Sequence, residues 1–110
     1  MENKDGQHFY ESQISSVLEQ QGVTRSTMMG FPCLRNDGDF FASCDHKTGD
    51  LIVKLTRDRV NDLIRAGTGK SFSPAGRPFK EWVMISNRDE KVWSDLLNEA
   101  HKLSQKRKAM

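Results

Sequence analysis

Residues 31–55 read FPCLRNDGDFFASCDHKTGDLIVKL, and this stretch decides the fold that we expect. Three short runs of apolar and β-favouring residues are separated by two groups of turn-forming residues, which predicts an antiparallel meander of three strands. The first group places Asp37 and Gly38 at the centre of a tight hairpin, where the backbone requires positive φ. The second group runs from Asp45 to Gly49.

The third run of the meander alternates between two faces of a strand. Leu51, Val53 and Leu55 fall on one face, and Ile52 and Lys54 fall on the other. The first of these faces is apolar and needs to be covered, so we expect flanking helices to pack on it.

One helix is predicted before the meander, over residues 7–21. Its apolar residues recur at helical spacing on one face: Tyr10, Ile14, Val17 and Leu18. Gly22 is placed to end this helix in a left-handed conformation. Residues 24–30 read as a connector to the first strand.

A second helix is predicted after the meander, with Thr56 as its N-cap and Gly67 at its end. Residues 68–78 are rich in Gly, Ser, Thr and Pro, which is typical of a long loop, with at most a short strand at 71–73.

A further strand is predicted at residues 81–85, and a last helix follows it. Asn87 and Glu90 have the spacing of a capping box at the start of that helix. The sequence therefore predicts one α+β domain over residues 1–110, in the order α-β-β-β-α-β(-β)-α. Its antiparallel sheet combines the meander with one or two further strands and is flanked by helices.

Charge and hydropathy limit the classes of function. The chain has 17 Lys and Arg against 15 Asp and Glu, and a net charge of +2 does not by itself imply a polyanionic partner. Residues 102–110 form a basic C-terminal tail that contains Lys102, Lys106, Arg107 and Lys108. No targeting signal is evident and no apolar run approaches the roughly 20 residues that span a bilayer, so we expect a cytoplasmic protein without membrane contact.

The two cysteines are expected to be free thiols. If Asp37 and Gly38 form the turn, Arg35 opposes Phe40 and Cys33 opposes Ala42. Cys44 is then only a diagonal neighbour of Cys33, which is too far for an ordinary disulfide. We expect both thiols to be partly buried and therefore inert as nucleophiles.

No other motif predicts catalysis, a metal or a cofactor. His8, His46 and His101 lack the short spacing of a zinc site. The sequence Gly69-Lys70-Ser71 matches only the end of a phosphate-binding loop and follows a helix, so a flexible loop is the better interpretation. We therefore expect a non-enzymatic protein without cofactor or metal.

The two tryptophans differ in their expected roles. Trp93 lies on the apolar stripe of the last helix and belongs in the core. Trp82 is either a core residue or part of an exposed aromatic and basic surface with Arg77 and Lys80, and such surfaces bind proteins or nucleic acids. The tail is explained by the helix dipole, and so few cations would bind phosphates only weakly.

Residues 29–54 and 76–83 contain the sequences GDFFA, LIVK and GRPFKEWV. In these motifs, and over residues 25–106 as a whole, the chain resembles the TfoX (Sxy) N-terminal domain family as a stand-alone short member. The resemblance implies an α+β fold and a regulatory role in bacteria. TfoX proteins promote transcription of DNA-uptake genes together with a cyclic-AMP receptor protein. Lys54 and Arg77 match polar positions of the family pattern.

Three hypotheses follow for the function. The leading one is a non-enzymatic bacterial regulatory module that acts through a protein partner, in transcription or competence. The alternative is a weak nucleic-acid-binding protein that uses the basic tail and residues 77–82. The third is a small-molecule or enzymatic role of Cys33 or Cys44. The candidate contact residues are Lys54, Arg77, Lys80, Trp82, Lys106, Arg107 and Lys108. The sequence leaves the oligomeric state open.

Overall fold

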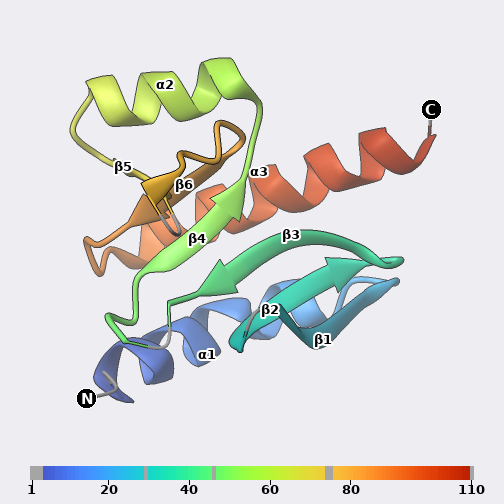
Figure 1. The fold of residues 1–110 in the computed structure, drawn as a ribbon. Coiled ribbons are helices and arrows are strands. Elements are labelled where there is room, and N and C mark those ends of the chain that lie inside the picture. The colour runs from blue at the N-terminus through green and yellow to red at the C-terminus, as the bar shows by residue number, and fades with distance from the viewer. Residues whose placement is uncertain (1–3, 29, 46, 74–75, 110) are drawn as a thin grey trace.

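The computed structural model describes residues 4–28, 30–45, 47–73 and 76–109 (Figure 1). These residues form three helices and six strands. The elements are α1 (Lys4–Leu18), β1 (Val23–Met28), β2 (Phe31–Asn36), β3 (Asp39–Cys44), β4 (Leu51–Lys54), α2 (Arg57–Arg65), β5 (Lys70–Ser71), β6 (Trp82–Ile85) and α3 (Glu90–Ala109). The predicted α+β class is confirmed.

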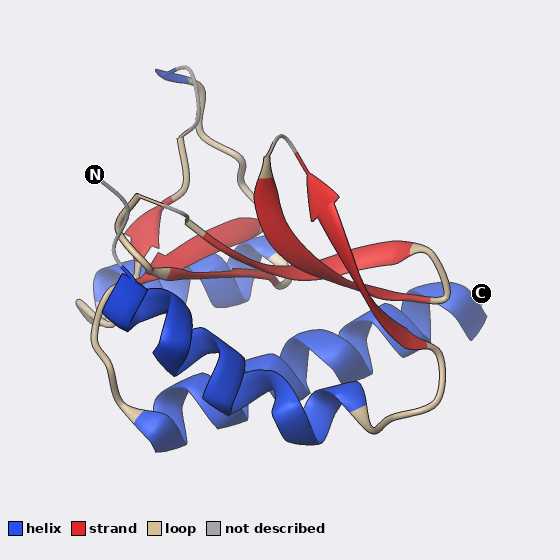
Figure 2. Cartoon of the chain, turned by 90° about the horizontal axis from the view of Figure 1, so that it is seen from below, coloured by secondary structure: helices blue, strands red, loops and turns tan. Residues whose placement is uncertain are grey.

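The six strands form one antiparallel sheet in the order β1-β2-β3-β4-β6-β5. All three helices lie on the same side of this sheet (Figure 2). Each helix contributes to a single apolar core with one face of the sheet, for example through Ile14 of α1, Leu63 of α2 and Leu97 of α3. The sheet therefore has one face covered by helices and one face that none of them covers.

The predicted meander is confirmed as β2, β3 and β4. Asp37 and Gly38 have φ values of 50° and 90°, as a tight hairpin turn with two left-handed residues requires. Arg35 opposes Phe40 as expected. The predicted pairing of Cys33 with Ala42 is wrong, because a β-bulge shifts the register and pairs Cys33 with Ser43.

This bulge places an extra residue of β3 against the core. Leu34 pairs with Ala42, and the next pair toward the turn is Arg35 with Phe40, so Phe41 has no opposite residue. Phe41 and Ala42 are both fully buried in the core cluster. The bulge thus lets one strand insert two consecutive side chains into the core.

The connector expected at residues 24–30 is instead mostly a strand. β1 pairs with β2 over its whole length, from Val23 opposite Asn36 to Met28 opposite Phe31. Its central residues are polar, and Arg25 forms an ion pair of 2.6 Å with Glu11 of α1. Polar residues suit an edge strand, where few side chains need to be buried. The absence of apolar alternation is why the sequence did not predict this strand.

The helix boundaries also differ in part from the prediction. α1 is observed at Lys4–Leu18 rather than 7–21. A turn follows it, in which the amides of Glu19 and Gln20 donate hydrogen bonds to the carbonyls three residues earlier. α2 has the predicted N-cap, because Thr56 Oγ1 accepts a hydrogen bond from the Arg59 amide at 3.2 Å. Strand β5 is Lys70–Ser71 rather than 71–73.

Asp89, and not Asn87, caps α3. Its Oδ1 accepts hydrogen bonds from the amides of Lys91 and Val92 at 3.0 and 3.2 Å. The carbonyl of Asn87 accepts the indole N–H of Trp93 at 2.6 Å instead. Trp93 is fully buried, which confirms its predicted place in the core.

The C-terminal half of α3 is attached to the β2–β3 hairpin by polar contacts. The buried Asn36 amide donates a hydrogen bond to Ser104 Oγ at 3.0 Å. Ser104 Oγ in turn donates to the carbonyl of His101 at 2.6 Å. One turn further on, Arg107 Nη2 lies 2.7 Å from Asp39 Oδ2. These contacts fix the register of α3 on the sheet.

We predict that Ser104→Ala lowers the free energy of unfolding by about 1–3 kcal/mol, because it leaves the buried Asn36 amide without its acceptor. Urea denaturation followed by circular dichroism measures the change. The exposed neighbour variant Gln105→Ala is the control and should change stability by less than about 0.5 kcal/mol. Equal stability of the two variants would show that the Asn36–Ser104 contact does not hold α3.

Candidate interaction surface

The sheet face opposite the helices is the candidate functional surface. Strand alternation directs Leu51, Val53, Val83 and Ile85 into the helix-covered core, so the intervening residues point the other way. We call this surface the open sheet face. It comprises Cys33, Arg35, Phe40, Ser43, Ile52, Lys54, Trp82 and Met84.

The centre of the open sheet face is buried although no described helix covers it. Cys33 is 2% exposed, and Ser43 and Ile52 are fully buried. Around this centre, Arg35, Phe40, Lys54, Trp82 and Met84 are each half-buried. The face therefore has a buried centre and a partly accessible ring of aromatic, cationic and thioether side chains.

Two neighbouring pairs of a cation and an aromatic residue lie on this ring. The Arg35 guanidinium lies 4.4 Å from the centroid of the Phe40 ring, a cation–π distance. Lys54 is the cross-strand partner of Trp82. The long stems of Arg and Lys cover apolar surface while their charged ends stay near water. The observed neighbour of Trp82 across the sheet is thus Lys54.

The segment before β6 rises from the sheet on the side away from the helices (Figure 2). Phe72 and Phe79 hold its two ends together, with an edge-to-face ring contact of 5.6 Å between centroids. The Phe79 amide also donates a hydrogen bond to the Phe72 carbonyl at 2.8 Å. Phe72 is buried, whereas Phe79 is 41% exposed.

The structure brings some of the predicted contact residues together and separates others. Lys54 and Arg107 line one open depression of about 400 Å³ with Asp37 and Asp39. Lys106 lines a different depression beside Thr56.

Lys80 lines a groove beside α2, and Arg77 is exposed in the loop before β6. The side chain of Lys108 lies outside the described residues. The predicted set is therefore spread over several depressions.

The basic C-terminal residues form the last turns of α3. Arg107 is half-buried and ion-paired with Asp39, whereas Lys102 and Lys106 are exposed. Cations near a helix C-terminus are stabilised by the helix dipole. Arg107 thus attaches the helix to the β2–β3 hairpin.

Both cysteines are free and buried, as predicted for free thiols. They lie on opposite faces of the sheet, Cys33 on the open sheet face and Cys44 in the core. Burial raises the pKa of the Cys44 thiol to about 12 and also raises the pKa of the Cys33 thiol. Both are protonated at neutral pH and are poor nucleophiles.

Two further titratable groups are enclosed in the core. The Tyr10 hydroxyl and His101 Nε2 are buried, and neither has a hydrogen-bond partner among the described residues. Burial raises the pKa of Tyr10 and lowers the pKa of His101. The ring of His101 lies 5.6 Å from that of Phe41, between centroids.

A polar cluster around the buried Asp50 joins two loops at one end of the sheet. Asp50 is 6% exposed, and its carboxylate accepts hydrogen bonds from Ser86 at 3.0 Å and Arg88 at 3.2 Å. Arg88 also donates to the carbonyl of Thr48 at 2.8 Å. The charge of Asp50 is therefore compensated, and the cluster holds the β3–β4 loop against the loop that precedes α3.

Within the described ranges, no three His, Cys, Asp or Glu side chains are grouped so that they could hold a metal ion. His8 is exposed and His101 is buried, while His46 lies outside the described residues. No helix in the described part of the chain is both long and apolar enough to cross a membrane.

No family model, curated protein or solved structure matches the chain. The fold and the open sheet face define an α+β protein whose antiparallel sheet is covered by helices on one of its two faces. The resemblance to the TfoX N-terminal domain stays a prediction.

Sequence reasoning missed part of this surface. Arg35 and Phe40 were correctly expected to oppose each other, but their role as a surface pair was not recognised. The sequence did contain a signal. Arg35 alternates with Asn36 and Phe40 alternates with Phe41, so Arg35 and Phe40 lie together on the opposite face of the strands. Met84 could have been assigned to the same face from its alternation with Val83 and Ile85.

We predict that both thiols resist alkylation in the folded protein. Iodoacetamide should modify Cys33 and Cys44 at least about 100-fold more slowly than in denaturant, because reaction requires unfolding. Mass spectrometry with peptide mapping measures the rates. A Lys70→Cys variant supplies an exposed thiol as the control and should react at once. Rapid native modification of Cys33 or Cys44 would support a role in chemistry.

We predict that His101 makes stability fall as the pH decreases. Its pKa is lowered in the folded state, so the unfolded chain binds the proton more tightly. The stabilising contribution is complete above the unfolded pKa of about 6.5 and is lost as the pH falls below it toward the folded pKa. Urea denaturation at a series of pH values should show a smaller loss for His101→Gln than for the wild type. Identical pH slopes would contradict this assignment.

Proposed function

We propose that the chain is a non-enzymatic interaction module that binds a protein partner through the open sheet face. The observation that carries the proposal is a ring of half-buried Phe40, Trp82 and Met84 on a face that no described helix covers. Arg35 and Lys54 flank these residues. Trp and Arg are frequent hot-spot residues in protein interfaces, and Met adapts to varied surfaces.

The positions of the reactive side chains support a non-enzymatic role. The described thiols, phenol and imidazole with shifted pKa values are all buried: Tyr10, Cys33, Cys44 and His101. A general acid, base or nucleophile needs to reach its substrate. None of the four lines the described depressions.

The resemblance to the TfoX N-terminal domain extends this proposal to the biological role. On that basis we infer a bacterial, cytoplasmic regulatory module in transcription or competence. The partner would then be a protein of the same regulatory system.

Nucleic-acid binding is the second candidate function. Some RNA-binding sheets stack bases on aromatic side chains of an open face, and Trp82 beside Lys54 has the required chemistry. Against it, Asp37 and Asp39 share the depression that contains Lys54 and Arg107, and they reduce its positive potential. Arg107 is also already paired with Asp39. A protein partner therefore ranks first.

The first experiment is an amide-resolved NMR titration with short single-stranded and duplex oligonucleotides at low and physiological salt. For a protein-binding module we expect no shifts at Lys54 or Trp82 at physiological salt. Shifts at these residues that weaken steeply with salt would support nucleic-acid binding and overturn the proposal.

The second experiment tests the open sheet face directly. The immobilised protein is used to retain partners from a lysate of the source organism, and the retained protein is then purified for affinity measurement. Lys54→Glu should weaken its binding by about 10-fold or more, because it reverses a charge beside Trp82. Lys91→Glu makes the same charge change on an exposed part of α3 and should leave affinity unchanged. Equal affinities of the two variants would place the interface elsewhere.

A further inference from the structure

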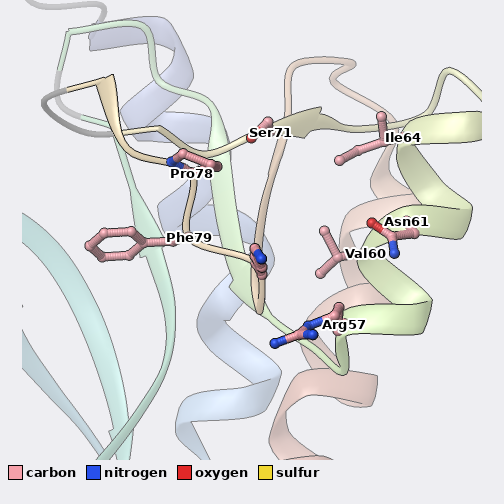
Figure 3. Close-up of a pocket in the computed structure, with 8 residues that line it drawn as sticks. Arg57, Val60, Asn61, Ile64, Ser71, Pro78 and Phe79 are labelled. Carbon is pink, nitrogen blue, oxygen red and sulfur yellow. The ribbon is translucent and has the colours of Figure 1, made fainter.

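A second surface lies between α2 and the loop before β6. Figure 3 shows Arg57, Val60 and Ile64 projecting from α2 toward the loop that carries Pro78. Together with Lys80 these residues line a groove of about 280 Å³, which we call the α2 groove.

The lining of the α2 groove is ordered along the helix. Arg57, Val60 and Ile64 are separated by three and four residues and so form one stripe. Arg57 is at the start of α2, and Ile64 is near its end. At about 1.5 Å per residue, the charged and apolar ends of the stripe are roughly 10 Å apart.

The apolar end of this stripe is accessible. Ile64 is 39% exposed, which is unusual in this chain, since Phe79 is the one other large apolar residue among those described that is exposed to this extent. Val60 is buried beneath the groove and Pro78 is exposed opposite it. Phe79 also lines the groove, but its ring points away from α2 in Figure 3, so Val60, Ile64 and Pro78 supply most of the apolar contact.

The charged end of the stripe is cationic. Arg59 pairs with Glu99 at 3.0 Å and Arg65 pairs with Asp62 at 3.5 Å. Within the described residues, no such ion pair is found for Arg57 or for Lys80. The N-terminus of α2 adds positive partial charge beside Arg57.

Acidic residues are nearby in sequence but not in the groove. Asp58 follows Arg57 and Glu81 follows Lys80, yet neither side chain is among those that line the groove. The site therefore combines two cations at one end with an apolar wall at the other.

We propose that the α2 groove binds an extended segment of a protein partner that carries an acidic residue and an apolar residue three positions apart. In the extended polyproline II conformation a chain rises about 3.1 Å per residue and, with three residues per turn, directs side chains three positions apart to the same side, so they span roughly 9 Å, close to the length of the stripe. The carboxylate lies between Arg57 and Lys80, and the apolar side chain packs on Val60, Ile64 and Pro78. This inference rests on the proposed function, because it names the kind of segment that a protein partner presents.

The test is an NMR titration of the full chain with short synthetic peptides. The probe is an extended, Gly- and Ser-flanked peptide with the pattern Glu-x-x-Leu. Two matched peptides replace its Glu by Lys or its Leu by Ser. We expect shifts at residues 57–64 and 78–80 with the first peptide, and at least about 10-fold weaker binding of the other two.

Variants of the protein locate the site. Arg57→Glu should weaken binding of the Glu-x-x-Leu peptide by about 10-fold or more, through loss of one attraction and addition of a repulsion. Arg65→Glu makes the same charge change on the same helix outside the groove and should leave binding unchanged. Lys80→Glu is a second groove variant, in the loop before β6 and outside α2. It tests the same site if Arg57→Glu perturbs the folding of α2.

Three outcomes would overturn this inference. They are no shifts in the groove, equal binding of all three peptides, and equal effects of Arg57→Glu and Arg65→Glu. Groove shifts caused by an oligonucleotide but not by the acidic peptide would assign the site to nucleic acid and also overturn it. If the peptide does not bind the α2 groove but Lys54→Glu still weakens binding of the protein partner, the open sheet face remains the interface. The two proposals can therefore fail separately.

Discussion

The docking of α3 across one face of the sheet is the constraint on which the rest of the structure depends. Trp93 anchors its first turns through complete burial and through the indole hydrogen bond to Asn87. Ser104 and Arg107 attach its last turns to the β2–β3 hairpin. Because α1 and α2 pack beside α3 on this same face, the described helices leave the opposite face of the sheet to its own side chains.

The composition of the open sheet face follows from that asymmetry. Ile52 is completely buried there without a helix above it, so neighbouring side chains and the segment before β6 have to exclude water. Long cationic side chains suit this task because their stems cover apolar area and their charges stay hydrated. Arg35 over Phe40 is the observed example. The residues that protect the sheet are therefore also chemically suited to recognition. In the interaction that we propose, stability and binding use the same surface.

Much of the fold could be predicted because its signals are local. The Asp37–Gly38 turn, the alternation of β4 and the Thr56 cap each depend on a few adjacent residues. The errors arose where tertiary context decides. β1 is a strand because β2 supplies hydrogen-bond partners, and the bulge at Phe41 lets two consecutive side chains of β3 enter the core, which no local pattern shows.

The surfaces were harder to predict for the same reason. Lys54 and Trp82 were both named from the sequence, but their pairing required the β4–β6 register. Arg57 and Ile64 carry no motif at all. The accessibility of their side chains depends on how the chain between α2 and β6 folds back, and no short sequence pattern encodes that path.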